Sequence, residues 1–264
     1  MSRFQRICLA HYHEIGLKGH NRASFEKRLL KNLEVLLGAF PVVTIHRISG
    51  RICVFLREGT DWGTARECAQ LMAKVPGVAR VSCGYKCPRE IDAMIEAALD
   101  AMGDAGEFAT FKVHARRNHT DFPVGSMEMN QVIGAALCEA RPDAGVRMKD
   151  PDLTVGVEVV QNAAYVYGWS ERGIGGLPVG SSGKVVCLLS SGIDSPVALW
   201  RMARRGATCI GVHFSGRPQT SDASEYLVDD IARVLQKTGC IYRTYTVPMG
   251  DMQRQIALDA PPEL

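Results

Sequence analysis

A stretch that could bind phosphate lies in the last third of the chain, where residues 187–200 read CLLSSGIDSPVALW. An apolar run enters a loop of small residues, and Asp194-Ser195-Pro196 can begin a helix. Backbone N–H groups in such a loop favour an anion, and so does the helix N-terminus behind them. Serine hydroxyls add donors, and Asp194 offers a carboxylate that could hold Mg²⁺ or cap the helix. An ordinary strand-to-helix turn would use the same residue types, so both interpretations stay open at this point.

Two common nucleotide-binding motifs do not describe this stretch. A Walker A loop requires G-x-x-x-x-G-K-[ST], but Gly176 and Gly183-Lys184 have the wrong spacing and Val185 follows the lysine. The loop also lacks the G-x-G-x-x-G spacing of a dinucleotide fingerprint. Any phosphate site here therefore belongs to another class.

Histidines and cysteines are the residue types of this chain that most often bind transition metals. His11, His13 and His20 lie close in the sequence, but they have no fixed spacing and no carboxylate partner. Cys83 and Cys87 lack a second pair of ligands, whereas structural zinc needs four. The nine cysteines are odd in number and scattered, mostly in apolar runs, which indicates reduced, buried thiols. We therefore expect no metal site in these side chains.

Composition sets the broad class of the protein. The 264 residues suffice for two modest domains or one large one, and the net charge is +3. Residues 1–64 hold ten Lys and Arg against five Asp and Glu, so a polyanion such as RNA is a permitted partner. A solvated helix face would explain the same charges. No apolar run approaches the roughly 20 residues of a membrane span, and we expect a cytoplasmic protein without a membrane partner.

The first part of the chain has the pattern of a small α+β domain. Residues 14–21 are expected to form a Gly- and Asn-containing turn, and Ser49-Gly50 to close a hairpin. The expected order is strand, helix, strand, strand, helix, strand, as in a ferredoxin-like fold. The predicted elements before the last strand are 7–12, 22–38, 42–48, 51–56 and 61–75.

The rest of the chain changes pattern twice. A second α+β unit has helices or strands at 89–102, 108–117, 126–140, 152–160 and 163–169. The glycine-rich segment 171–184 is typical of a linker. Strands then alternate with helices at 184–189, 194–206, 208–214, 224–239 and 241–247. This alternation predicts a parallel, doubly wound sheet, although about three strands is few for a nucleotide-binding domain.

The stretch SSGIDSP resembles the S-G-G-x-D-S loop of the PP-loop ATP pyrophosphatases. Five further segments resemble, in order, parts of the tRNA 4-thiouridine synthase (tRNA sulfurtransferase) family: HYHEIGLKGHNRASFEKRLLKNL, FPVGSMEMN, GIGGLPVGSSGK, SGIDSPVALW and GVHFSGRPQTSDAS. The resemblance implies an N-terminal ferredoxin-like domain, a THUMP domain and a PP-loop domain. We expect these at 1–64, 65–170 and 184–264, with a linker at 171–183, and the PP-loop domain to be partial.

The resemblance implies ATP and Mg²⁺ as cofactors and Asp194 as the essential residue. It places ATP contacts at Leu188, Leu189, Ser190, Ser191, Gly192, Ile193, Asp194, Ser195, His213 and Phe214. Basic residues in or beside the resembling segments are candidates for tRNA phosphates, although exposed charge alone would explain each: Lys18, Arg22, Lys112, Arg116 and Arg117.

The activity that the resemblance implies is thiolation of tRNA. Members of the family adenylate the uridine at position eight, which makes AMP the leaving group, and a cysteine persulfide then delivers sulfur. A cysteine desulfurase or another persulfide donor is therefore an implied partner beside tRNA, and many members form homodimers. In some bacteria the same protein supplies sulfur for the thiazole of thiamine.

Two departures from the family pattern bear on activity. Ser191 stands where the loop has its first glycine, and a Cβ there can crowd a phosphate or resist a positive φ. Serine is also small and donates a hydrogen bond, so loss of binding does not necessarily follow. Family members continue well beyond the position of Leu264, and none of Cys187, Cys209 and Cys240 matches their sulfur-transfer cysteine. The chain is thus expected to be a fragment, a truncated product or half of a split enzyme. The alternative function is a catalytically incomplete, THUMP-type tRNA-binding module.

Overall fold

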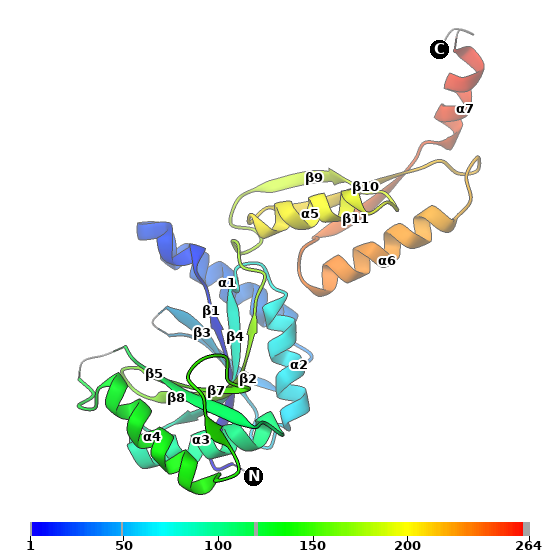
Figure 1. Ribbon diagram of the computed structural model, residues 1–264. Coiled ribbons are helices and arrows are strands. Elements are labelled where there is room, and N and C mark those ends of the chain that lie inside the picture. The colour runs from blue at the N-terminus through cyan, green and yellow to red at the C-terminus, as the bar shows by residue number, and fades with distance from the viewer. Residues whose placement is uncertain (1, 49, 119–120, 261–264) are drawn as a thin grey trace. The chain divides into compact units, whose positions relative to one another are not determined.

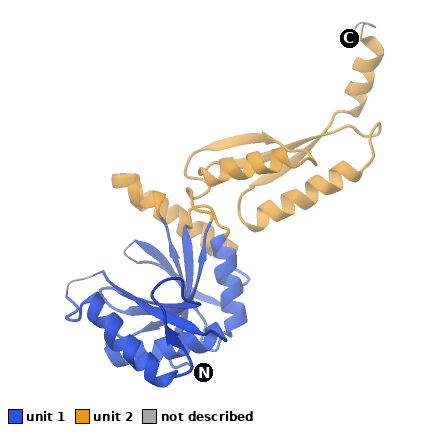
Figure 2. Ribbon diagram, in the orientation of Figure 1, with its two compact units in different colours: residues 1–12, 37–73, 79–173 blue, residues 13–36, 74–78, 174–264 orange. Residues whose placement is uncertain are grey.

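The computed structural model describes residues 2–48, 50–118 and 121–260 (Figure 1). The chain forms two compact units (Figure 2). Unit 1 comprises residues 1–12, 37–73 and 79–173. Unit 2 comprises residues 13–36, 74–78 and 174–264. The turn position Ser49 and residues 261–264 of the expected third domain lie outside the described residues.

The first half of the unit 1 sheet has the ferredoxin-like strand order β2-β3-β1-β4 with antiparallel neighbours. Its elements are β1 (Gln5–His11), β2 (Val42–Ile48), β3 (Arg51–Leu56), α2 (Trp62–Ala73) and β4 (Arg80–Cys87). Helix α1 (Arg22–Leu36) follows β1 in the chain and is assigned to unit 2. The expected order of strands and helices, including the pairing of β2 with β3, is confirmed.

The second half of unit 1 extends the same sheet. Its elements are α3 (Ile91–Ala105), β5 (Thr110–Arg117), α4 (Ser126–Ala140), β6 (Gly145–Val146), β7 (Leu153–Val159) and β8 (Ala164–Arg172). Antiparallel pairing of β4 with β8 makes one eight-stranded sheet of order β2-β3-β1-β4-β8-β7-β5-β6. The register shifts between Cys83 and Gly84, and a Cβ on Gly84 would collide with the Val166 carbonyl and Tyr167. Only glycine fits there.

Helices α3 and α4 cover one face of this half of the sheet (Figure 1). Helix α3 buries Met94, Ala97, Ala98 and Ala101 at the spacing of one helical face. They pack with residues of β5 that alternate along the strand, from Phe111 through Val113 to Ala115. The intervening residues of β5 therefore point to the opposite face of the sheet.

Unit 2 contains a separate three-stranded parallel sheet of order β11-β10-β9. Its elements after the linker are β9 (Lys184–Leu188), α5 (Asp194–Arg204), β10 (Thr208–Ser215), α6 (Ala223–Lys237), β11 (Arg243–Pro248) and α7 (Gly250–Asp259). The parallel α/β pattern is confirmed, and α7 was not predicted. Residues 14–21, expected to be a turn, form a 3₁₀ helix that Gly19 interrupts at φ 51°. Glycine accepts this left-handed conformation, which explains why the helix does not run on smoothly into α1.

The two faces of the small sheet differ. Residues of α5 and α6 pack with Val185, Cys187 and Cys209 on one face. Both connections run in the same direction along the sheet, which puts both helices on this face. The other face is apolar and exposed among the described residues, at Val186, Leu188, Phe214 and Tyr245.

A buried polar cluster holds unit 1 together at the junction of its two halves. The Glu158 carboxylate of β7 is 1% exposed and accepts from Tyr167 Oη at 2.8 Å and His11 Nε2 at 2.9 Å. Arg51 Nη2 lies 2.7 Å from its other oxygen, and Arg80 Nη2 lies 3.5 Å from the first. Because these residues come from five strands, the cluster depends on the whole register of the sheet.

The cluster should make unit 1 sensitive to acid. Burial raises the pKa of Glu158, but the hydrogen bond of His11 and the charge of Arg51 outweigh it and lower the pKa to about 2. Burial lowers the pKa of His11, the arginines lower it further, and Glu158 only partly opposes them. Since both pKa values are lower in the folded protein, the unfolded chain binds more protons. The free energy of unfolding therefore decreases as the pH is lowered.

We expect this loss in two stages. The His11 contribution declines below about pH 6.5, and the Glu158 contribution, about 3 kcal/mol, declines from about pH 4.3 towards pH 2. Trp62 and Trp169 lie in unit 1, so their fluorescence in a Trp200→Phe variant follows unit 1 alone. Urea titrations between pH 7 and pH 3 test the prediction, and a midpoint that stays constant over this range would contradict it.

Candidate nucleotide and RNA sites

The Ser190–Ile193 loop joins the end of β9 to the start of α5, at the carboxyl edge of the parallel sheet. Ligands of open α/β sheets bind at this edge. The loop is exposed and is closed by its own serines. Ser190 N donates to Ser195 Oγ at 2.9 Å, the two hydroxyl oxygens lie 3.0 Å apart, and Ser195 Oγ donates to the Ser190 carbonyl at 3.3 Å. These bonds fold the loop back over the first turn of α5.

This closure leaves backbone donors free in the loop. In the described part of the chain, the N–H groups of Ser191 and Ile193 have no hydrogen-bond partner, and that of Gly192 has only Ser190 Oγ at 3.4 Å. They lie at the N-terminus of α5, where the helix dipole adds partial positive charge. The residues present therefore suit an anion such as a phosphate chain.

Asp194 is exposed and is the first residue of α5. Ile193 occupies the N-cap position, and no described side chain makes a capping hydrogen bond to the helix. The capping role considered for Asp194 is therefore not realised. Its carboxylate has no hydrogen bond or ion pair to any described residue. A free carboxylate beside a phosphate site is the kind of group that shares Mg²⁺ with bound phosphates.

The structure removes one of the two concerns about Ser191. Among the described non-glycine residues, only Asp150 has a positive φ, so Ser191 does not resist its conformation. Gly192 also has no left-handed φ. The loop conformation therefore does not require glycine at either position.

We predict that Ser191→Gly has little effect on nucleotide affinity. Removing the side chain costs no backbone strain, so the dissociation constant should change by about threefold or less, under about 0.7 kcal/mol. Calorimetric titration of both forms with ATP measures it. A gain of about tenfold or more on introducing glycine would mean that the Ser191 side chain obstructs the phosphates.

The candidate ATP contacts at the ends of β9 and β10 are two pairs of neighbouring residues, and in each pair one side chain is buried and the other is exposed. Leu189 is 2% exposed and His213 is 6% exposed, whereas Leu188 is 65% and Phe214 is 47% exposed. Alternation along each strand puts Leu188 and Phe214 on the open apolar face. Of the four, only these two exposed side chains can contact a ligand directly, while Leu189 and His213 can act through the backbone.

The five candidate tRNA contacts fall in both units. Lys18 and Arg22 lie in unit 2, on the 3₁₀ segment and at the start of α1. The Lys18 ammonium lies 5.2 Å from the centre of the Phe25 ring, and Arg22 Nε donates to Glu26 at 2.7 Å. Arg22 is therefore partly neutralised within its own helix turn.

The other three candidates lie on β5 in unit 1, but on different faces. Lys112 and Arg116 point away from α3 and α4, with His114 between them. Burial lowers the pKa of His114, and the charges of Arg116 and Lys112 lower it further, which indicates a positive local field. Arg117 instead donates through Nη1 to the Phe122 carbonyl at 2.8 Å. The two adjacent arginines therefore cannot act as one phosphate clamp from this strand.

The cysteines are free thiols, and seven of the nine are buried. Burial raises the pKa of Cys187 and Cys240, and it raises the pKa of Cys209 and Cys87 to about 12. Thiols of this kind are poor nucleophiles. The described residues contain no group of three or more His, Cys, Asp and Glu that could hold a metal ion.

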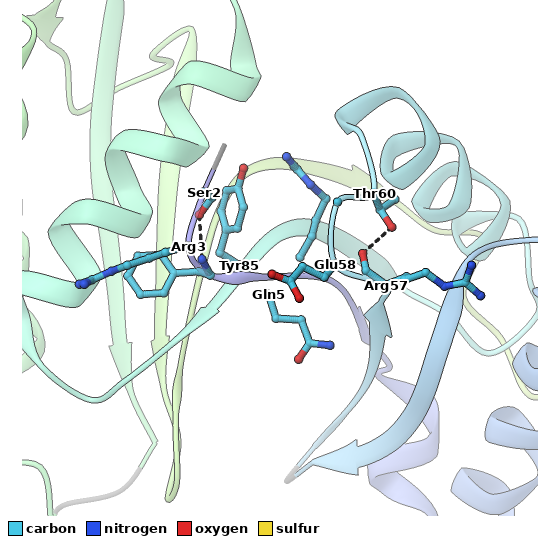
Figure 3. Close-up of a pocket in the computed structure, with 10 residues that line it drawn as sticks. Ser2, Arg3, Gln5, Arg57, Glu58, Thr60 and Tyr85 are labelled. Carbon is cyan, nitrogen blue, oxygen red and sulfur yellow. Dashed lines mark hydrogen bonds between the residues drawn. The ribbon is translucent and has the colours of Figure 1, made fainter.

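A hollow of about 340 Å³ in unit 1 was not anticipated from the sequence (Figure 3). It lies between the N-terminal segment and the loop after β3, with Tyr85 at its wall. Of the arginines that line it, Arg3 pairs with Glu96 at 2.6 Å and Arg6 pairs with Asp104, whereas Arg57 is exposed. Glu58 also lines it, so the hollow is not a strong anion site.

Comparison with known proteins agrees with this architecture. Residues 7–82 match the model of the ThiI ferredoxin-like domain, 88–168 the THUMP domain, and 180–264 the thiamine biosynthesis protein (ThiI). The fold and the serine loop thus define a protein with ferredoxin-like, THUMP and PP-loop domains. The chain belongs to the tRNA sulfurtransferase (ThiI) family. The domain borders at 64, 170 and 183 stay predictions.

Two curated relatives, both called "Probable tRNA sulfurtransferase", are 36% identical to the chain. The protein from Streptococcus sanguinis (strain SK36) matches over 96% of the chain and 62% of its own length. The protein from Thermoanaerobacter sp. (strain X514) matches over 98% of the chain and 66% of its own length. The chain therefore spans somewhat less than two thirds of these relatives.

Solved structures show the same fold. A 4-thiouridine synthetase in complex with RNA and bound ATP superposes with a TM-score of 0.84 at 30% identity, covering 97% of the chain and 65% of that protein. PH1313 from Pyrococcus horikoshii Ot3 superposes with a TM-score of 0.77 at 24% identity, covering 96% of the chain and 82% of that protein. No described helix has the length and apolar character that a membrane crossing needs.

Proposed function

We propose that the chain is the RNA-binding and nucleotide-binding part of an ATP-dependent tRNA sulfurtransferase that forms 4-thiouridine at position eight. The observation that carries the proposal is the Ser190–Ile193 loop, with free N–H donors beside the unpaired Asp194 carboxylate. This loop lies in a chain whose relatives are named tRNA sulfurtransferases. The related 4-thiouridine synthetase was solved with RNA and ATP.

In the proposed reaction the uridine oxygen attacks the α-phosphorus of ATP and pyrophosphate leaves. The terminal sulfur of a persulfide then bonds to the activated carbon, and AMP leaves with the oxygen. A second thiol of the donor attacks the inner sulfur, which breaks the S–S bond, leaves the terminal sulfur on the base and forms a disulfide on the donor. The loop N–H groups would hold the phosphates, and Leu188 and Phe214 would contact the nucleoside. Mg²⁺, when bound, neutralises phosphate charge, and Asp194 is the residue that would share it.

The sulfur should come from a partner. Burial raises the pKa of Cys187, Cys209 and Cys240 and so disfavours their thiolates, which supports a separate persulfide donor such as a cysteine desulfurase. Delivery of sulfur to the thiazole of thiamine would use the same donor chemistry. From the family resemblance we also propose that the protein forms a homodimer and that it lies in the cytoplasm.

A second candidate function is an RNA-binding module without turnover. The small sheet has only three strands among the described residues, and one face is bare, which favours an incomplete catalytic domain. Two separate titrations distinguish the candidates: ATP by calorimetry and tRNA by filter retention. Tight ATP binding supports the enzyme. Retained tRNA binding without ATP affinity supports the module, and loss of tRNA binding at low salt contradicts both.

The open face of β5 gives a prediction for RNA affinity. Lys112→Gln or Arg116→Gln should each reduce the slope of log affinity against log salt concentration by about 1, because each removes one phosphate contact. Arg57→Gln is the matched control, since Arg57 is an exposed cation of unit 1 outside this face. Filter retention of tRNA across a salt series measures the slopes. Equal slopes for all three variants would remove β5 from the RNA interface.

A further inference from the structure

Among the described residues, the His213 side chain makes one hydrogen bond, and it reaches the residue directly before the Ser190–Ile193 loop. Its Nδ1 lies 3.0 Å from the Leu189 carbonyl oxygen. A carbonyl oxygen only accepts, so Nδ1 carries the proton and donates. Its other nitrogen, Nε2, is buried and has no hydrogen-bond partner in the described part of the chain. The hydrogen bond to Leu189 is therefore the polar interaction that this buried side chain, 6% exposed, contributes to the described structure.

The hydrogen bond from His213 is one of three that hold the backbone at Leu189 and Ser190, where the loop begins. Leu189 N donates to the Val212 carbonyl at 2.8 Å, which continues the pairing of β9 with β10 beyond Leu188. The Leu189 carbonyl accepts from His213, and Ser190 N donates to Ser195 Oγ at 2.9 Å. Three consecutive backbone groups are thereby held, directly before the N–H groups that stay free.

We propose that His213 is a positioning residue, whose Nδ1–H fixes the Leu189 peptide and so aims the loop N–H groups at the phosphates. The nucleotide part of this inference rests on the function proposed above. The loop-ordering part does not, because it follows from the contact to Leu189. This role requires a hydrogen-bond donor at the position of Nδ1, but it does not require the imidazole ring itself.

Three substitutions separate this role from simple packing. The side-chain amide nitrogen of asparagine occupies the place of Nδ1, whereas that of glutamine occupies the place of Nε2. His213→Asn should therefore keep the contact, and His213→Gln and His213→Ala should lose it. His46→Ala is the matched control, because His46 is an exposed histidine of unit 1.

The first measurement is amide hydrogen exchange of the segment 188–193 without nucleotide. We expect exchange to quicken by about tenfold in the alanine and glutamine variants, the effect of losing one buried hydrogen bond. The asparagine variant and His46→Ala should match the parent protein. Equal exchange in the asparagine and glutamine variants would overturn the inference, even if the alanine variant failed to fold.

The second measurement is the ATP dissociation constant by calorimetry. It should rise by about tenfold in the glutamine variant and stay within about twofold in the asparagine variant. If the parent protein binds no ATP, the proposed function fails while the exchange experiment still decides the role of His213. If the parent binds and all variants bind equally, the positioning role is wrong and the nucleotide site stands.

Discussion

Asp194→Asn is expected to weaken binding of Mg²⁺-ATP by about 30- to 100-fold, the usual effect of losing a charged contact of about 2–3 kcal/mol. Metal-free ATP should bind no worse, because the carboxylate then only repels the phosphates. The structure supports this contrast, since Asp194 is exposed, does not cap α5 and has no partner among the described residues.

Calorimetric titrations with and without Mg²⁺ measure this effect. Asp251→Asn is the matched control, since Asp251 is also an exposed carboxylate in the first turn of a unit 2 helix. Asp251 lies on α7, more than 50 residues after the Ser190–Ile193 loop in the sequence. An equal loss for both forms of ATP would show that Asp194 shapes the loop. Equal binding by the parent and the variant would remove Asp194 from the site.

Glu158→Gln is expected to destabilise unit 1 by about 3–5 kcal/mol, because it leaves buried arginine charge without its counter-charge. Arg51 is 8% exposed and cannot turn out to solvent without disturbing β3. Urea titration of the Trp200→Phe background, followed by tryptophan fluorescence, measures the change. Glu67→Gln, on the exposed side of α2, should change the midpoint very little.

A double variant tests whether the charges are coupled. Arg51→Met removes a cation, so Arg51→Met/Glu158→Gln should lose about 2 kcal/mol less than the sum of the single losses. The acid dependence should also weaken in Glu158→Gln below about pH 4.3, because the titrating carboxylate is gone. Additive losses would show that the two side chains contribute independently.

The sequence predicted most elements because their signals are local. Periodic apolar residues marked α3, and the alternation of strand and helix marked the parallel sheet. The 3₁₀ helix at 14–21 was mistaken for a turn, since Gly and Asn favour either. Pairing of β4 with β8 was not predicted, because strand partners far apart in sequence leave no local signal.

The site was predictable where it is one continuous loop and less so elsewhere. Ser190 and Ser195 lie five residues apart and close the loop on themselves. Arg116 and Arg117 are adjacent in sequence, yet a strand sends successive side chains to opposite faces, and only one stays available on the open face. Glu158 is a lone charged residue within an apolar strand, a pattern that indicates a buried ion pair and that was missed. Its partners Arg51 and Arg80 come from strands distant in the sequence, so the sequence does not identify them.

The bare face of the unit 2 sheet has a consequence for handling the protein. Strand β9 pairs on one side only among the described strands, and Val186 and Leu188 beside that edge are exposed. An unpaired, apolar edge favours strand addition from a neighbouring molecule. In concentrated solutions the protein should therefore associate through the sheet of unit 2. The unit that holds the Ser190–Ile193 loop thus limits the concentration at which titrations and crystallisation can be attempted.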